Sequence, residues 1–211
     1  MTMLRIPLAF CLAIALPAHA DCVTADSLAT GVTFKREDGH TGIIRAAGKM
    51  FEIDYATNSN GIWRDKRLSR LGIYDSEWQS TPTNENYVGG GPGGDFSYKF
   101  SGKPPLPKAD TTWATTVSER KSLEAGLQSG PVITRSSYKV TYSYLPTKTA
   151  KLSGCSYTIQ PVEAHFTNKN TDLTRRFIYF PDLGFGLETR VIDRKGDASR
   201  ELGLTSLTPK G

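Results

Sequence analysis

Hydrophobic and polar residues alternate along most of this chain, in short runs that turn-forming residues separate. The clearest example is residues 155–192, where three alternating runs follow one another and Pro181-Asp182-Leu183-Gly184 has the composition of a turn. This pattern predicts three antiparallel strands with a buried face that carries Phe180, Ile178, Phe185, Leu187 and Val191. The predicted cross-strand pairs are Phe180 with Phe185, Ile178 with Leu187, and Arg176 with Thr189.

The first of these three runs changes phase at Pro161, since Tyr157 and Ile159 share one side before it and Val162, Ala164 and Phe166 share a side after it. A proline inside a strand predicts an edge position or a bulge. Residues 32–45 predict another hairpin around Asp38-Gly39, which would set Phe34 opposite Ile43.

The remaining segments extend the same pattern, so the predicted class is mainly β, with antiparallel hairpins and at most one or two short helices. Residues 62–78 are predicted as strand despite the helix-like spacing of their leucines. Residues 118–128 are the best helix candidate, because Ser118 can cap the segment and Gly130-Pro131 would end it; a loop is the alternative. Residues 23–30 allow one helical turn, and 202–207 a short strand.

Residues 1–20 have the features of a secretory signal: Arg5 at the positive end, an apolar run over 6–16 and the cleavage pattern Ala18-His19-Ala20. We therefore expect a mature chain that starts at Asp21 and forms a single β-rich domain over 21–211. No later segment is long and apolar enough to cross a membrane. The protein is expected to be soluble and either periplasmic or secreted.

Two further features follow from this expected export. Removing Arg5 lowers the formal net charge from +5 to +4, and this modest excess does not indicate a nucleic-acid partner. The mature chain keeps Cys22 and Cys155, which an oxidising compartment favours as a disulfide. That bond would tie the mature N-terminus to the start of the 155–192 region.

Catalytic signals are sparse. His165 and Glu163 share one strand face and are the only local acid–base pair, so they are the weak catalytic candidates. The chain has no GxSxG, no HExxH and no Cys/His cluster, so we predict no metal and no cofactor.

Three other stretches are candidates for binding. Tyr138, Val140, Tyr142 and Tyr144 lie on one side of a strand, so these tyrosines could line a ligand groove, or could be covered by a loop or linker. The basic residues over 64–70 could bind anionic surfaces, or could simply be a solvated edge strand. The Gly-rich loop at 89–94 could be a flap over a cleft or a connector, and it lacks the Gly-Lys-Ser/Thr of a phosphate-binding loop.

Several short motifs together resemble an uncharacterised family of exported Gram-negative proteins. They are Asp21-Cys22, the Pro-rich turn over Pro107–Trp113, Gly154-Cys155-Ser156-Tyr157 and Tyr179-Phe180-Pro181-Asp182-Leu183-Gly184. The resemblance implies an antiparallel sheet curved into a half-barrel or open barrel, similar to the periplasmic lipoprotein carriers LolA and LolB. It also implies a periplasmic location and a concave apolar face, and it supplies no catalytic residues.

These observations lead to three hypotheses of function. The first is a periplasmic module that binds a lipid, another hydrophobic molecule or an envelope protein on a curved sheet face. The second is a secreted hydrolase that uses His165, Glu163 or other carboxylates. The third is a structural or assembly protein of the envelope, which would contact anionic surfaces through its basic stretch.

Overall fold

The computed structural model describes residues 21–56, 63–83, 93–123, 130–193 and 203–210, which form a mainly antiparallel β structure with one short helix. The predicted fold class is therefore confirmed. The predicted signal sequence and residues 89–92 of the Gly-rich loop lie outside the described residues. The elements are α1 (Ser27–Thr30), β1 (Val32–Arg36), β2 (Thr41–Ala47), β3 (Met50–Ala56), β4 (Trp63–Arg70), β5 (Tyr74–Pro82), β6 (Gly94–Phe100), β7 (Thr111–Leu123), β8 (Val132–Tyr144), β9 (Lys148–Leu152), β10 (Cys155–Thr167), β11 (Asp172–Phe180), β12 (Phe185–Asp193) and β13 (Leu204–Pro209).

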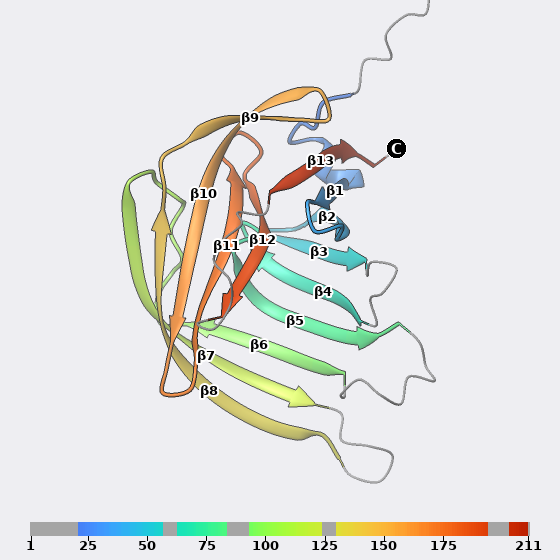
Figure 1. The fold of residues 1–211 in the computed structure, drawn as a ribbon. Helices are drawn as coiled ribbons and strands as arrows, with labels where there is room; N and C mark the ends of the chain where they lie inside the picture. Colours follow the sequence, from blue (N-terminus) through green and yellow to red (C-terminus); the bar gives the residue numbers. More distant parts are fainter. Residues whose placement is uncertain (1–20, 57–62, 84–92, 124–129, 194–202, 211) are drawn as a thin grey trace, which may run out of the picture.

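All of these strands belong to one sheet, in the order β12-β11-β10-β8-β7-β6-β5-β4-β3-β2-β1-β13, with β9 paired to β10. The sheet curves into a nearly closed barrel shape (Figure 1). Strand β12 stands at one end of this strand order and lies inside the curve of the sheet. Its Gly186 amide donates a hydrogen bond to the Leu71 carbonyl of the β4–β5 turn at 2.7 Å. Both faces of the β11–β12 hairpin are therefore covered by protein over much of their length.

Two clusters of buried hydrophobic residues fill the two sides of this hairpin. The first joins α1, β1–β3, β9 and β13 to the start of β10 and to Phe180, Phe185 and Leu187. The second joins β5, β7 and β8 to the end of β10 and to Phe177 and Tyr179. The sequence pattern identified one buried face of this hairpin, whereas the curved sheet buries both.

The phase change at Pro161 marks the point where β10 passes from one cluster to the other. Tyr157 and Ile159 belong to the first cluster, while Val162, Ala164 and Phe166 belong to the second. Pro161 lies between two partners, because β9 pairs up to Ile159 and β8 pairs from Val162 onward. The prediction of an edge strand is wrong, since β10 also pairs with β11. At this junction the missing N–H of proline interrupts no ladder.

The first hairpin has a register one residue away from the predicted one. Phe34 lies opposite Gly42, and Thr33 lies opposite Ile43. The Arg36 amide donates to the His40 carbonyl, so the loop has three residues rather than two and ends at Gly39, whose φ is +88°. Three-residue hairpins with glycine in the left-handed region are a common alternative to the two-residue turn that Asp-Gly suggests.

The β11–β12 hairpin follows the prediction near its turn and departs from it further along. Phe180 pairs with Phe185 and Ile178 with Leu187, as predicted. A bulge between Arg176 and Phe177 then sets Arg176 opposite Arg190, not Thr189. The bulge also places Val191 on the other face from Leu187, and Val191 is 51% exposed rather than buried.

Two other predictions of secondary structure need correction. Residues 118–123 continue β7 and are not helical, because this stretch pairs with β6 on one side and β8 on the other. Tertiary pairing here overrides local helix propensity; residues 124–128 lie outside the described residues. The described part of the predicted strand, residues 63–78, spans two strands, β4 and the start of β5, joined by a turn in which Leu71 and Gly72 have φ values of +55° and +66°.

The remaining local predictions agree with the structure. One helical turn forms at Ser27–Thr30, and a strand forms at Leu204–Pro209. The sulfur atoms of Cys22 and Cys155 lie at disulfide-bonding distance, with their Cα atoms 5.7 Å apart. This bond ties the segment before α1 to the first residue of β10, as the sequence predicted.

Candidate functional site

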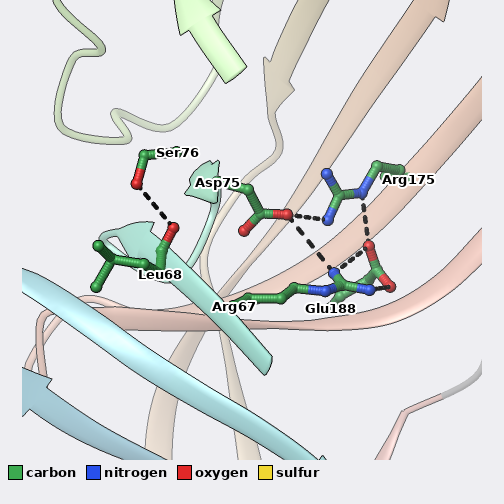
Figure 2. A network of polar contacts seen from close by, with 6 residues as sticks. All are labelled: Arg67, Leu68, Asp75, Ser76, Arg175 and Glu188. Carbon is green, nitrogen blue, oxygen red and sulfur yellow. Dashed lines mark hydrogen bonds and ion pairs between the residues drawn. The ribbon is translucent and has the colours of Figure 1, made fainter. Parts of the chain in front are cut away.

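Four charged side chains meet inside the curved sheet, where β4 and β5 face β11 and β12 (Figure 2). Arg67 donates two hydrogen bonds to Glu188, at 3.0 and 3.2 Å. Arg175 donates to Glu188 and to Asp75, each at 2.6 Å. Arg67 and Asp75 also lie 3.6 Å apart. We call Arg67, Asp75, Arg175 and Glu188 the charged quartet.

The quartet is buried and balanced in charge. The Asp75 and Glu188 side chains are each only 4% exposed. Burial alone would raise the pKa of Glu188, but the positive charges of Arg175 and Arg67 outweigh it and lower the pKa to about 2. Burial likewise opposes the charge on Arg67, but Glu188, Tyr55 and Asp75 raise the pKa of its guanidinium. Glu188, Arg67 and Arg175 are therefore ionised at neutral pH, since Glu188 and Asp75 also raise the pKa of Arg175.

Arg67 also stacks between two aromatic rings. Its guanidinium carbon lies 4.9 Å from the centre of the Tyr55 ring and 5.1 Å from that of Trp78. These cation–π contacts and the two bonds to Glu188 hold the side chain in one orientation. Its Nε atom is buried and has no hydrogen-bond partner among the described residues.

A cavity of about 360 Å³ adjoins the quartet, and we call it the Arg67 cavity. Most of its lining is charged, with walls from β1, β3, β4, β12 and the β1–β2 loop. The lining residues are Arg36, Asp38, His40, Tyr55, Asp65, Arg67, Glu188, Arg190 and Val191. At its edge Arg36 is hydrogen-bonded to Asp38, and His40 Nδ1 lies 3.0 Å from an Asp38 oxygen.

A second hollow of about 620 Å³ lies on the face of β10 and β11, beside β9 and the start of β13, and we call it the β9–β11 groove. Its lining combines apolar side chains with charged ones. The apolar residues are Leu145, Pro146, Ala150, Leu152, Ile159, Pro161, Val162, Phe177, Ile178 and Leu204, and the charged ones are Glu37, Lys148, Lys151, Glu163 and Arg176. Arg176 donates to Glu163 at 2.8 Å, whereas Lys148 and Lys151 are exposed.

The predicted catalytic pair does not form a common site. His165 is 50% exposed on β10 and hydrogen-bonds Asp172 at 2.8 Å, while Glu163 bonds Arg176. Glu163 lines the β9–β11 groove, but His165 lines neither this groove nor the Arg67 cavity. His165 and Glu163 therefore have different partners, Asp172 and Arg176, and do not form a shared acid–base pair.

Tyr138, Tyr142 and Tyr144, which we call the tyrosine ladder, pack in the second buried cluster. Tyr142 and Tyr144 are 1% and 2% exposed, and Tyr138 is half-buried. Tyr144 and Tyr74 have hydroxyl oxygens 2.6 Å apart, and Tyr74 in turn donates to the Pro105 carbonyl at 3.1 Å. The proline-rich linker thus contacts this hydroxyl chain, which is the covered alternative that the sequence left open. None of the three lines the Arg67 cavity or the groove.

The basic stretch over 64–70 is divided between the two faces of β4. Arg64 is hydrogen-bonded to Asp54, and Lys66 lies 3.1 Å from Glu52, so acidic residues of β3 pair with both cations on the outer face. Arg67 points inward to the charged quartet. The stretch therefore presents less positive charge to an anionic surface than its composition suggests.

Sequence reasoning missed the quartet as a unit. One signal was available, because the predicted pairing of Ile178 with Leu187 sets Glu188 opposite Phe177, on the face that also carries Tyr179. A carboxylate that is buried in its charged form is paired with a cation or coordinates a metal, so a glutamate among aromatic residues is a signal to look for a buried partner. The identity of that cation could not be read locally, because Arg67 is 121 positions away.

Comparisons of the chain with protein-family models, curated proteins and solved structures find no match. Within the described residues, no helix has the length and apolar character needed to cross a membrane. No group of three or more His, Cys, Asp or Glu side chains in the same part of the chain is placed to hold a metal ion.

Proposed function

We propose that this protein is an exported, periplasmic binding module that holds a hydrophobic or amphipathic molecule of the cell envelope in the β9–β11 groove. The groove itself carries the proposal. Its volume of about 620 Å³ lies within the range of about 300–1,000 Å³ that is usual for small-molecule sites. Its apolar lining, from Leu152 and Ile159 to Ile178, can contact a hydrocarbon chain.

The charged residues at the groove suggest the chemistry of the head group. Arg176 is bonded to Glu163, so much of its charge is already compensated. Lys148 and Lys151 are exposed and lie on the same strand, β9. An acidic head group near these lysines, with its chain over the apolar residues, would match both parts of the lining.

Native mass spectrometry tests whether a ligand is present. The mature protein is purified from periplasm, and its mass is measured before and after denaturing extraction. We expect a bound mass that denaturation removes. A displacement assay with a fluorescent fatty acid then tests the site, with oleate expected to compete better than oleyl alcohol. The double variant Lys148→Glu/Lys151→Glu should lower oleate affinity roughly tenfold, because the carboxylate of oleate loses two exposed charge contacts.

The matched control is Lys99→Glu/Lys139→Glu, which makes the same charge change at exposed lysines outside the groove. An equal loss in this control would show that oleate binds through general charge and not through the groove. Absence of both a bound mass and displacement would contradict the proposed function.

A further inference from the structure

The far end of β8 has a strand partner on one side only. Strand β7 pairs with β8 from Val132 to Tyr144, whereas β10 pairs with it only from Lys139 onward. Strand β8 continues past the turn between β10 and β11 (Figure 1). Among the described residues, no strand pairs with the second side of residues 132–138, and we call this stretch the β8 edge. None of its residues lines the β9–β11 groove or the Arg67 cavity.

The β8 edge presents backbone groups that another strand could bind. On the side of β10, the Leu145 amide donates to β10 at 3.0 Å, and the Ser137 carbonyl accepts from Asn168 at 3.4 Å. Residues of an antiparallel strand alternate between its two neighbours, and the register of β8 with β7 is unbroken. The odd-numbered residues therefore face away from β7. The N–H and C=O groups of Ile133 and Arg135 point to the open side, where no described strand pairs with them.

Two hydrophobic side chains of the β8 edge are exposed. Val132 is 51% exposed and Ile133 is 45% exposed, although both belong to a strand. They point to opposite faces, because side chains alternate along a strand, and Ile133 shares the outer face with Arg135. A regular strand edge with exposed hydrophobic side chains is a template for pairing with another chain. An added strand would cover both side chains.

The charge beside the β8 edge indicates the chemistry of the partner. Arg135 lies directly opposite Arg120 of β7, and both side chains are exposed. Like charges that lie opposite each other destabilise a sheet, so a carboxylate placed next to Arg135 would be stabilising. A second copy of this chain would instead add another pair of arginines to the same surface. The arrangement therefore favours an acidic partner over self-association.

We propose that the β8 edge binds an extended segment of another protein as an added antiparallel strand, with an acidic side chain opposite Arg135 and an apolar one opposite Ile133. In this mode of recognition, main-chain hydrogen bonds supply affinity and alternate side chains supply specificity. The row of backbone donors and acceptors matches another polypeptide backbone. Antiparallel addition continues the pairing that β8 already makes with β7 and β10.

The probe that tests this is the acetylated and amidated peptide TTTETIT. Antiparallel pairing sets its glutamate opposite Arg135 and its isoleucine opposite Ile133. We titrate it into isotope-labelled mature protein and follow the backbone amides by NMR. The amides of Ile133 and Arg135 should shift saturably, with a Kd on the order of 1 mM or tighter.

Two methylated forms of the peptide test the backbone pairing. The N–H of the glutamate would face β8, so its N-methylation should abolish binding. The N–H of the threonine that follows would face away from β8, because neighbouring residues of a strand alternate. N-methylation at this threonine is the matched control and should leave most of the binding.

A charge exchange tests the role of Arg135. Arg135→Glu should weaken binding of TTTETIT about fivefold, because an exposed attraction becomes a repulsion, and should favour the peptide TTTKTIT. Lys35→Glu makes the same charge change at an exposed residue of β1 and should leave both affinities unchanged. Because the Arg135 side chain is exposed, the variant is expected to fold, and its thermal midpoint checks this.

Four results would overturn the inference. The first is that TTTETIT does not saturate the protein up to about 5 mM. The second is an equal loss of binding with both methylated peptides. The third is that folded Arg135→Glu binds TTTETIT as tightly as the unmodified protein. The fourth is a dimer in sedimentation velocity that Ile133→Asp abolishes, which would assign the β8 edge to a second copy of the chain.

Discussion

Glu188 carries a negative charge inside the protein, and Arg67 and Arg175 compensate for it. Replacing it as Glu188→Gln would leave two buried guanidinium groups with Asp75 as the remaining anion of the quartet. Removing one partner of a buried ion pair costs about 3–5 kcal/mol, and we expect a loss of this order in the free energy of unfolding. Urea denaturation at pH 7 measures it. Glu77→Gln on the exposed outer face should change it little, and an equal loss in both variants would contradict the role of the quartet.

The same residue predicts a dependence on pH. The pKa of Glu188 is about 2 in the folded protein and 4.5 for an unperturbed glutamate. The unfolded chain therefore binds more protons between these values, so ionised Glu188 stabilises the fold above pH 4.5 and loses this effect as the pH falls through about 2. The difference in unfolding free energy between the unmodified protein and Glu188→Gln should shrink over that interval. A constant difference would show that charge is not the cause.

At the scale of elements, the β4–β5 turn is held against β12 by a close backbone approach. A Cβ atom on Gly72 would lie 2.0 Å from the Gly186 carbonyl oxygen, and Gly72 has a φ of +66°. Gly72→Ala should therefore destabilise the protein well beyond the roughly 1–2 kcal/mol that a left-handed alanine costs. The control is Gly48→Ala, which has a φ of +64° and no atom within 4 Å. Equal midpoints of thermal unfolding for the two variants would contradict the close approach.

At the scale of the whole molecule, the disulfide links two points 133 residues apart in the chain. The chain-entropy model gives about 5 kcal/mol of stabilisation at most for a loop of this length. We expect the Cys22→Ser/Cys155→Ser variant to lose a large part of this in urea denaturation without a reducing agent. Dithiothreitol should lower the stability of the unmodified protein and leave that of the variant unchanged. A loss on reduction in both would show that the effect does not come from this bond.

The residues around the turns were the most predictable part of the fold. Pro181–Gly184 and the alternation on either side were sufficient to pair Phe180 with Phe185, because turn geometry and side-chain alternation are local properties. The phase change at Pro161 was equally readable, and it marks a real change of partner strand. The register of the first hairpin was missed by one residue, because Asp-Gly is compatible with loops of two and of three residues.

The tertiary structure decided what the local pattern could not. Residues 118–123 begin with Ser118, which can cap a helix, yet these residues pair with β6 and β8 as part of β7. The tyrosine ladder could have lined a groove, yet Tyr142 and Tyr144 are buried in the second cluster, and the proline-rich linker contacts Tyr74, the partner of Tyr144. Both outcomes depend on segments that are distant in the chain, so no window of sequence contains the interactions that determine them.

By itself, the sequence determined an antiparallel, hairpin-rich protein and the pairing of Cys22 with Cys155. Alternation, turn residues and the number of cysteines are properties that a single chain displays directly. Only the tertiary structure joined Arg67 and Asp75 to Arg175 and Glu188, and only it formed the Arg67 cavity and the β9–β11 groove. These features arise where the sheet closes on itself, because curvature brings together strands that share no local signal.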